Sequence, residues 1–257
     1  MPNPHGSFIW YELITADPAA AADFYGTLVG WQAADAGVPG LDYRILSHEA
    51  GGVAGIMTLP PGAGEAGMRA GWFGYLGVED VDAAVAGVVE AGGQVHMEAQ
   101  DIPSVGRLAM VADPQGVPFY LMRGESDGES NAFHPKAVGR ISWNELVTTD
   151  QAAALDFYCG HYGWERAGEM PMGELGAYVF LAHNGRPIGA VMNAPPGQDR
   201  PKWNFYIRVG DIDAAAERVR AAGGRVLQGP MEVPGDDFVI DGEDPQGVKF
   251  GLVGSRS

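Results

Sequence analysis

The sequence predicts an α+β protein of two tandem domains, each with two βαβββ units whose strands form an open, curved eight-stranded sheet. Three observations predict this fold. The chain repeats itself once, each half contains the order strand, helix and three strands twice, and the same closing turn recurs in both halves. A long period that occurs only twice is typical of a duplicated domain rather than of a solenoid, which stacks three or more short repeats. The 257 residues suffice for two domains of roughly 120 residues each.

The repeat joins identical residues that lie 133 positions apart near the start of each half. These pairs are Trp10/Trp143, Glu12/Glu145, Leu13/Leu146, Asp17/Asp150, Phe24/Phe157, Tyr25/Tyr158 and Trp31/Trp164. Near the end of each half the spacing is 131 residues, where Asp113-Pro114-Gln115-Gly116-Val117 returns as Asp244-Pro245-Gln246-Gly247-Val248. Because the spacing changes so little, we expect the length differences between the halves to lie in connecting loops.

The first unit opens with a predicted strand over Phe8–Ile14. Asp17-Pro18 suits the N-cap and first position of a helix, which we predict over Ala19–Leu28. Gly30 ends this helix. Three strands then follow around Trp31–Ala34, Asp42–Ser47 and Val53–Leu59.

The second unit repeats this order, with a predicted strand over Trp72–Val78 and a helix over Val81–Ala91 that Asp80 caps. Its three strands lie near Gln94–Glu98, Leu108–Ala112 and Val117–Met122. The polar run after Arg123 is typical of a linker. We therefore place the first domain at 1–124, the linker at 125–136 and the second domain at 137–257.

The composition narrows the classes of function. A net charge of −17 disfavours nucleic acid and anionic membrane surfaces as partners. No apolar run is long enough to span a membrane, and the N-terminus lacks the pattern of a signal peptide. The single cysteine, Cys159, excludes an intramolecular disulfide and fits a reducing cytoplasm. We expect a cytoplasmic protein.

The paired βαβββ units, the segment from Glu12 through Asp17 to Phe24-Tyr25, and the closing Asp-Pro-Gln-Gly-Val turn resemble the vicinal oxygen chelate superfamily. That superfamily includes glyoxalase I, bleomycin-resistance proteins, extradiol dioxygenases and fosfomycin-resistance enzymes. The chain is most similar to its tandem-domain, glyoxalase-like actinobacterial members. The resemblance implies two tandem vicinal-oxygen-chelate domains, but the fold hosts isomerases, lyases, dioxygenases and binding proteins, so it does not imply one activity.

The resemblance also implies where a divalent metal would be held, by His, Glu or Gln side chains of the first and last strands of each unit. Counting from the repeated aspartates places these positions at Trp10, Phe73, Tyr120 and near Ile56 in the first half, and at Trp143, Asn204, Gly251 and near Val191 in the second. None of these residues is a histidine or a carboxylate, and divalent metals in proteins need such ligands. We therefore expect no metal and no other cofactor.

Aromatic and acidic residues stand at or beside these positions instead. Residues two apart on a strand share a face, so Glu12 accompanies Trp10, and Glu145 accompanies Trp143. We predict a cleft that binds a small hydrophobic or aromatic ligand through Trp10, Glu12, Phe73, Tyr75, Tyr120, Trp143, Glu145, Asn204, Tyr206 and Arg208. The alternative is that these aromatic residues are plain core and that the glutamates are structural.

Two hypotheses on function remain open. The first is a metal-free binding protein that sequesters or carries a metabolite or antibiotic. The second is an enzyme, a glyoxalase-type isomerase, lyase or oxygenase-related protein, in which Glu12 or Glu145 is the general base and Tyr75 or Tyr206 the donor.

The halves differ at some of these positions. Gly77 corresponds to Arg208, and Tyr120 to Gly251, so we expect the second cleft to be more polar and more open at its last strand, and the halves to bind ligand unequally. We expect His48 and His183 to be solvated residues of hairpin turns. A tandem chain can complete its own cleft, which favours a monomer.

Overall fold

The computed structural model describes residues 3–38, 40–49, 51–59, 69–197 and 200–256. Two open eight-stranded sheets, one from each half, hold the strands in the orders β2-β3-β4-β1-β5-β8-β7-β6 and β10-β11-β12-β9-β13-β16-β15-β14. The predicted α+β class and the four βαβββ units are confirmed.

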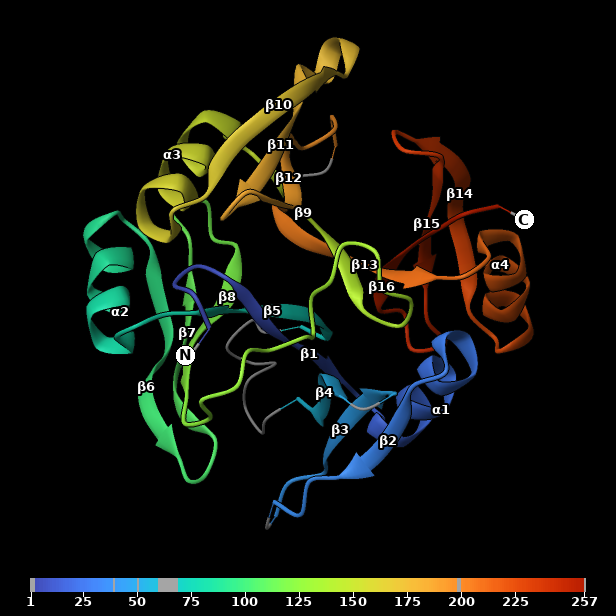
Figure 1. Ribbon diagram of the computed structural model, residues 1–257, viewed down its shortest axis with the longest axis horizontal. Helices are drawn as coiled ribbons and strands as arrows, with labels where there is room; N and C mark the ends of the chain where they lie inside the picture. The colour runs from blue at the N-terminus through green and yellow to red at the C-terminus, as the bar shows by residue number, and fades with distance from the viewer. Residues whose placement is uncertain (1–2, 39, 50, 60–68, 198–199, 257) are drawn as a thin grey trace. The chain divides into compact units, whose positions relative to one another are not determined.

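The elements follow the predicted order in both halves (Figure 1). The first half contains β1 (Phe8–Thr15), α1 (Pro18–Val29), β2 (Gln32–Asp35), β3 (Tyr43–His48), β4 (Gly51–Thr58), β5 (Gly71–Gly77), α2 (Val81–Glu90), β6 (Gln94–Ile102), β7 (Gly106–Ala112) and β8 (Pro118–Gly124). The second half contains β9 (Ile141–Thr148), α3 (Gln151–Tyr162), β10 (Glu165–Pro171), the short 3₁₀ helix η1 (Gly173–Leu175), β11 (Ala177–His183), β12 (Arg186–Asn193), β13 (Lys202–Val209), α4 (Ile212–Ala221), β14 (Arg225–Val233), β15 (Asp237–Glu243) and β16 (Lys249–Gly254). The helix η1 was not predicted.

All four α-helices begin in the same way. In α1, the carboxylate of the N-cap residue Asp17 accepts a 3.0 Å hydrogen bond from the backbone N–H of Ala20. In the other three helices, the carboxylates of Asp80, Asp150 and Asp211 accept the corresponding hydrogen bond from a backbone N–H. An N-cap of this kind satisfies one of the amides that a helix leaves without an internal partner, which explains why the aspartates recur.

The chain divides into two compact units, and each unit combines one βαβββ module from each half. Unit 1 contains the N-terminal segment to Ile9, Phe73–Ser130 and Trp143–Trp203. Unit 2 contains Trp10–Trp72, Asn131–Ser142 and Asn204–Ser257. In unit 2, α1 packs against α4 from the other half.

Each unit has a core of aromatic rings. In unit 1, Tyr158 of α3 stacks on Trp164 with ring centroids 5.1 Å apart and meets Trp203 edge-on. In unit 2, Tyr25 of α1 stacks on Trp31 at 5.9 Å and meets Trp72 edge-on. These rings are the repeated Phe-Tyr and Trp residues of the sequence, so much of the repeat specifies core packing.

No helix in the described part of the chain is long and apolar enough to cross a membrane.

Candidate functional site

In unit 1, a hydrogen-bonded cluster joins β9 and β11. The indole N–H of Trp143 donates to the hydroxyl oxygen of Tyr178 at 2.8 Å, and that hydroxyl donates to Oε2 of Glu145 at 2.9 Å. An indole nitrogen can only donate, so the hydroxyl proton of Tyr178 points to the carboxylate. We call Trp143, Tyr178 and Glu145 the second-half triad. All three side chains are partly exposed.

The corresponding residues of the first half lie in unit 2. The hydroxyl of Tyr43, on β3, donates to Oε2 of Glu12, on β1, at 3.2 Å. The ring of Trp10 lies against Gly52, where an added Cβ would come within 3.1 Å of the indole. Trp10 and Glu12 therefore share one face of β1, as the strand alternation predicted, but only 1% of Glu12 is exposed.

Glu12 is buried and Glu145 is partly exposed. The two halves differ at one residue of the strand that pairs with each glutamate, which is β4 in the first half and β12 in the second. Gly55 of β4 pairs with Glu12 of β1. A Cβ added at Gly55 would lie 2.3 Å from the hydroxyl oxygen of Tyr43 and 2.5 Å from Oε1 of Glu12. The Tyr43–Glu12 pair therefore lies directly on the backbone. The corresponding partner of Glu145 is Ala190, which has a methyl group where Gly55 has none.

Phe180 extends the aromatic surface of the second-half triad. Its ring centroid lies 5.6 Å from that of Tyr178 and 6.2 Å from that of Trp143, and both pairs meet edge to face. Ile45 occupies the matching place in the first half, where it pairs with Gly55. The second half therefore presents three partly exposed rings beside one carboxylate.

The three predicted aromatic residues of β5 and β8 pack on one another. Tyr75 stacks on Tyr120 with centroids 4.2 Å apart and an interplanar angle of 11°, and Phe73 meets Tyr120 edge-on at 6.3 Å. All three side chains are buried. Their contacts are those of packed core, the alternative that the sequence left open.

The predicted polar residues of β13 are engaged by carboxylates of β15. The hydroxyl of Tyr206 donates to Oδ1 of Asp241 at 3.1 Å. The ring of Tyr206 covers Gly251, because a Cβ added there would come within 2.4 Å of it. The expectation of a more open last strand is therefore wrong at this point, since the tyrosine occupies the space that the glycine leaves.

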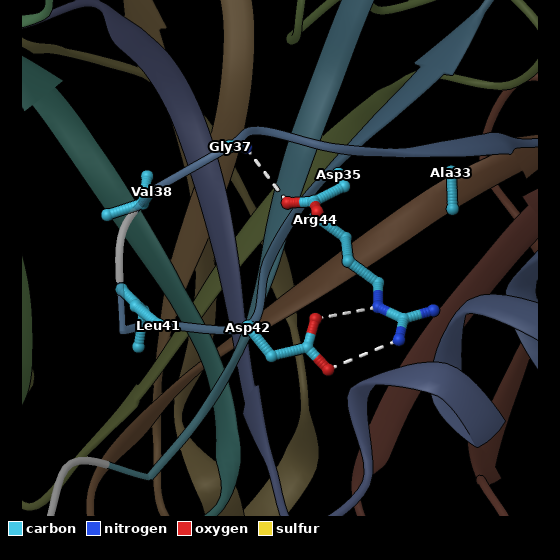
Figure 2. Close-up of a pocket in the computed structure, with 7 residues that line it drawn as sticks. All are labelled: Ala33, Asp35, Gly37, Val38, Leu41, Asp42 and Arg44. Atoms are coloured by element: carbon cyan, nitrogen blue, oxygen red, sulfur yellow. Dashed lines mark hydrogen bonds and ion pairs between the residues drawn. The ribbon is translucent and has the colours of Figure 1, made fainter.

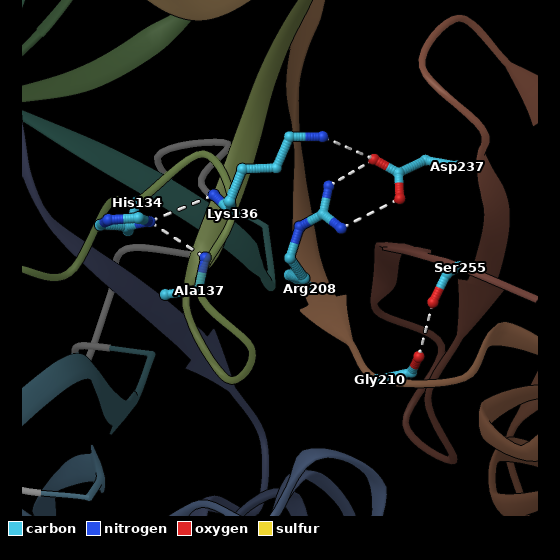
Figure 3. A network of polar contacts seen from close by, with 7 residues as sticks. All are labelled: His134, Lys136, Ala137, Arg208, Gly210, Asp237 and Ser255. Carbon is cyan, nitrogen blue, oxygen red and sulfur yellow. Dashed lines mark hydrogen bonds and ion pairs between the residues drawn. The ribbon is translucent and has the colours of Figure 1, made fainter.

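Arg208 forms the centre of a second polar network (Figure 3). Its guanidinium holds the carboxylate of Asp237 through two bonds, of 3.0 and 2.6 Å, and Lys136 adds a third contact at 3.2 Å. Arg208 and Asp237 are both more than 90% buried. The hydrogen bonds from Arg208 lower the pKa of Asp237. Arg208 therefore forms an ion pair with Asp237. Asn204, the third predicted residue of β13, is partly exposed.

A pocket of the first half lies away from all of these residues. The pocket lies at the β2–β3 hairpin and has a volume of about 560 Å³. Figure 2 shows Arg44 bound to Asp42 through two hydrogen bonds. Its lining residues are Ala33, Asp35, Gly37, Val38, Leu41, Asp42 and Arg44. This pocket is charged and contains none of the predicted site residues.

The two repeated histidines differ from the prediction. His183 is only 8% exposed, and burial lowers its pKa. His48 is partly exposed, with its ring beside Gly139, where an added Cβ would come within 2.5 Å of it. The expectation of two solvated turn histidines is therefore wrong for His183, because it is the last residue of β11 and its side chain is buried.

The side chains do not fit a divalent metal. Within the described ranges, no three His, Cys, Asp or Glu side chains gather into a group that could hold one. The buried carboxylate of Glu12 accepts a hydrogen bond from Tyr43 and is accompanied by Trp10 rather than by a second ligand. A metal with only one carboxylate and aromatic neighbours lacks the ligands that it needs.

Two residues that carry the site were missed in the sequence. Tyr43 and Tyr178 lie in strands that the pattern predicted, and they correspond across the repeat at a spacing of 135 residues. This spacing was the signal in the sequence that could have identified the two tyrosines as a repeated pair. The sequence assigned the donor role to Tyr75 and Tyr206, whose described contacts are instead a ring stack with Tyr120 and a bond to Asp241.

Comparisons with known proteins agree with this architecture. The sequence profile of the Glyoxalase/Bleomycin resistance protein/Dioxygenase superfamily matches residues 7–121 and 140–252. CFP32 of Mycobacterium tuberculosis (strain CDC 1551 / Oshkosh), a glyoxylase by name, is 36% identical over 247 residues, which cover 95% of this chain and 93% of CFP32. The anthracycline biosynthesis protein DauV of Streptomyces sp. (strain C5) is 34% identical over 263 residues, covering 98% of this chain and 94% of DauV.

Among solved structures, the Mn(II)-bound glyoxalase from Novosphingobium aromaticivorans is similar in fold, with a TM-score of 0.66 and 17% sequence identity. The alignment covers 100% of this chain and 83% of the glyoxalase.

Proposed function

Because the chain belongs to the Glyoxalase/Bleomycin resistance protein/Dioxygenase superfamily, we propose that it binds a hydrophobic, planar aromatic molecule, without a metal ion, against the second-half triad and Phe180. Binding of this kind serves to sequester or carry a metabolite or an antibiotic. The observation that carries the proposal is the set of three partly exposed rings fixed around one carboxylate.

The physical basis is the pairing of aromatic area with one fixed polar group. Rings of Trp, Tyr and Phe offer large apolar contact area and orient a planar ligand through stacked or edge-on contacts. Trp143 and Tyr178 are tied together by a hydrogen bond, so little side-chain entropy remains to be lost when a ligand arrives.

Two further observations support the proposal. Among the described residues, no three His, Cys, Asp or Glu side chains form a group that could hold a metal ion, which supports recognition of the ligand through rings and hydrogen bonds. DauV, a relative covered over 94% of its length, is named for anthracycline biosynthesis, which supports a planar, fused-ring ligand for this chain.

An enzymatic role at the same triad is the second candidate. Glu145 is partly exposed and accepts a hydrogen bond from Tyr178 at 2.9 Å, the distance expected for a general base with a supporting hydroxyl. A glyoxalase-type isomerase, lyase or oxygenase-related reaction would then use Glu145 as its base. Glu145→Gln distinguishes the two, because it abolishes turnover by a general base while leaving the ring contacts of a binding protein in place.

The test is calorimetric titration of the whole chain with 2-naphthol and 2-methoxynaphthalene, in buffer with and without EDTA. We expect saturable binding that EDTA does not change and that Trp143→Ala weakens. Arg166→Gln, which alters an exposed ion pair with Asp156, is the matched control and should bind as the parent does. Binding that appears only after addition of Mn²⁺ or Zn²⁺, or that survives Trp143→Ala, would contradict the proposal.

A further inference from the structure

At a place that contains no residue of the second-half triad, we infer that a pocket between α2 and α3 of unit 1 binds the guanidinium group of an external ligand. The pocket has a volume of about 370 Å³. The inference follows from what fills the same place in the other half of the repeat and from the groups that line the pocket. Its lining residues, all of unit 1, are His5, Glu79, Asp80, Ala83, Ala84, Gly87, Gly160, His161 and Tyr162.

In unit 2, an arginine of the chain itself bridges the corresponding pair of helices. Arg218 of α4 donates through Nε to the carbonyl oxygen of Leu28, in the last turn of α1, at 2.9 Å. The residue 131 positions earlier, at the same point of α2, is Gly87. Ala215 of α4 is buried, whereas its counterpart Ala84 of α2 is partly exposed. The side chain that bridges the two helices of unit 2 is thus missing from unit 1.

A second difference between the halves adds a negative charge to unit 1. Glu79, beside the N-cap of α2, corresponds to Gly210 of unit 2. The backbone N–H of Glu79 donates to Nδ1 of His5, and its carbonyl oxygen accepts from Arg123, but within the described ranges its carboxylate forms no hydrogen bond or ion pair. Arg123 is not among the residues that line the pocket. Unit 1 therefore lacks the arginine and gains a carboxylate, which suits a cation supplied from outside.

The imidazole of His161 adds a neutral acceptor. Its Nδ1 lies 2.9 Å from the carbonyl oxygen of Phe157, which can only accept, so Nδ1 carries the proton and Nε2 of the neutral ring accepts. A Cβ added at Gly87 would lie 3.7 Å from this Nε2, so the acceptor lies beside the point where the arginine side chain is missing. The carbonyl oxygen of His161, the counterpart of that of Leu28, already accepts from Nε2 of His5 at 2.8 Å. A ligand therefore meets the carboxylate and the imidazole.

A planar cation with several donors matches these acceptors. A guanidinium carries five N–H donors in one plane, so it can donate to a carboxylate and to an imidazole nitrogen at the same time. An ammonium group has three donors and is more strongly hydrated. The positive end of α2 by itself favours an anion, but Asp80 already accepts the N–H of Ala83 there. An anion would also be repelled by Glu79 and by the net charge of −17.

The test is a titration of the whole chain with butylguanidinium, butylurea, butylammonium and butyrate at low ionic strength. The ring signals of His161 in NMR spectra, assigned with His161→Gln, report binding. Butylurea has nearly the shape of butylguanidinium without its charge, and we expect it to bind about threefold more weakly, as is typical of an exposed ion pair. Added salt should reduce this difference, and butyrate should not bind.

Two pairs of variants locate the site. Glu79→Gln should remove the preference for butylguanidinium over butylurea, whereas Glu98→Gln, the same change at an exposed position of β6 outside the pocket, should keep it. Gly87→Arg should abolish binding, because it supplies the side chain that unit 2 has at this point. Gly87→Ala adds a methyl group to the same helix without filling the pocket and should still bind.

The Gly87 variants are expected to fold. A Cβ at this position meets His161 at 3.4 Å, an ordinary contact, and both arginine and alanine favour a helix more than glycine does. Circular dichroism establishes that each variant is folded. Unchanged binding of butylguanidinium to a folded Gly87→Arg variant would overturn the inference.

The remaining outcomes decide the chemistry of the ligand. Equal binding of butylguanidinium and butylurea, tighter binding of butylammonium or butyrate, or binding of none of the four probes would also overturn the inference. The peptide acetyl-Gly-Arg-Gly-amide distinguishes two sources of the same group. If it binds as butylguanidinium does, the pocket accepts an arginine side chain of a peptide, and if only butylguanidinium binds, the ligand is a small molecule.

Discussion

The hydroxyl of Tyr158, in α3, donates a 3.1 Å hydrogen bond to Oδ2 of Asp113, the residue that opens the turn between β7 and β8. The other carboxylate oxygen of Asp113 accepts the backbone N–H groups of Gln115 and Val117, both at 2.9 Å. A helix of the second half thus completes a turn of the first. The bond is fully buried.

The repeat forms the corresponding bond with the two halves exchanged. Tyr25, in α1 of the first half, donates to Oδ2 of Asp244 at 3.4 Å, and Asp244 opens the closing turn of the second half. The repeated Phe-Tyr and Asp-Pro-Gln-Gly-Val motifs therefore join the two halves within each unit. Their recurrence is explained by packing and hydrogen bonding and requires no catalytic role.

Replacing Tyr158 by Phe should lower the free energy of unfolding by about 1–3 kcal/mol, since a buried carboxylate oxygen loses its donor. The replacement keeps the ring stack on Trp164, and it also removes the acceptor of the Trp203 indole N–H, which lies 3.3 Å from the hydroxyl oxygen. Urea denaturation followed by circular dichroism measures the change.

Tyr25→Phe is the matched comparison for that variant. Its bond to Asp244 is longer, 3.4 Å against 3.1 Å, so we expect a smaller loss of stability. Equal stability of the Tyr158→Phe variant and the parent would show that the hydroxyl contributes nothing to joining the halves.

The stability should also fall below about pH 6.5 because of His183. Burial lowers the pKa of His183 from its ordinary value of 6.5, so below that pH the unfolded chain binds a proton that the folded chain resists. The contribution of the neutral imidazole is complete above pH 6.5 and is lost as the pH falls toward the lowered value. His183→Gln should reduce the difference between urea midpoints at pH 7.5 and pH 5.5, while His96→Gln, at an exposed position, should not.

The ion pair of Arg208 and Asp237 should behave as a unit. Arg208→Met leaves a buried carboxylate with Lys136 as its remaining cation, and we expect a loss of about 3–5 kcal/mol, as is typical when one partner of a buried pair is removed. Arg208→Met with Asp237→Ala should recover much of that loss, because no buried charge remains. The first half has Gly77 and Gly106 at these places, so the fold does not depend on the pair. A double variant as unstable as the single one would contradict this account.

The fold could be predicted from the sequence because its determinants are local and occur in each half. The N-cap aspartates, the glycines that end α1 and α3, and the strand alternation fix each βαβββ unit. The combination of modules into units could not be predicted, because it depends on bonds such as that of Tyr158 with Asp113, which are 45 residues apart in the chain. No local pattern reports a contact of that kind.

The site could be predicted in part. Alternation placed Glu12 with Trp10, and Glu145 with Trp143, on shared faces, but the hydroxyls that hold these carboxylates come from another strand. The difference between the halves was sought at Gly251 and Arg208, but the halves also differ at the pairing partner of the glutamate, which is Gly55 in the first half and Ala190 in the second. Register across three strands determines it, and the sequence of one strand does not contain that information.

A metal-loading experiment should give a negative result. The protein, purified without chelator and then exposed to Zn²⁺, Ni²⁺, Mn²⁺ or Fe²⁺ and passed through a desalting column, should retain far less than one ion per chain by mass spectrometry. The reason is the absence of a three-ligand group within the part of the chain that the structure describes. Retention close to one ion would show that side chains rearrange to build a site.

Gly55→Ala should open a second binding site in the first half. The new methyl group would lie 2.3 Å from the hydroxyl oxygen of Tyr43 and 2.5 Å from Oε1 of Glu12, and both are ends of side chains that can rotate away. The pair must then move away from β4, and we expect Glu12 to become more exposed, as Glu145 is. We expect the Trp143→Ala variant, which has lost the second-half site, to regain binding of 2-naphthol when Gly55→Ala is added. Calorimetry measures the recovery, and circular dichroism establishes that the double variant is folded. A folded double variant that does not bind would show that the depth of the carboxylate is not what separates the two halves.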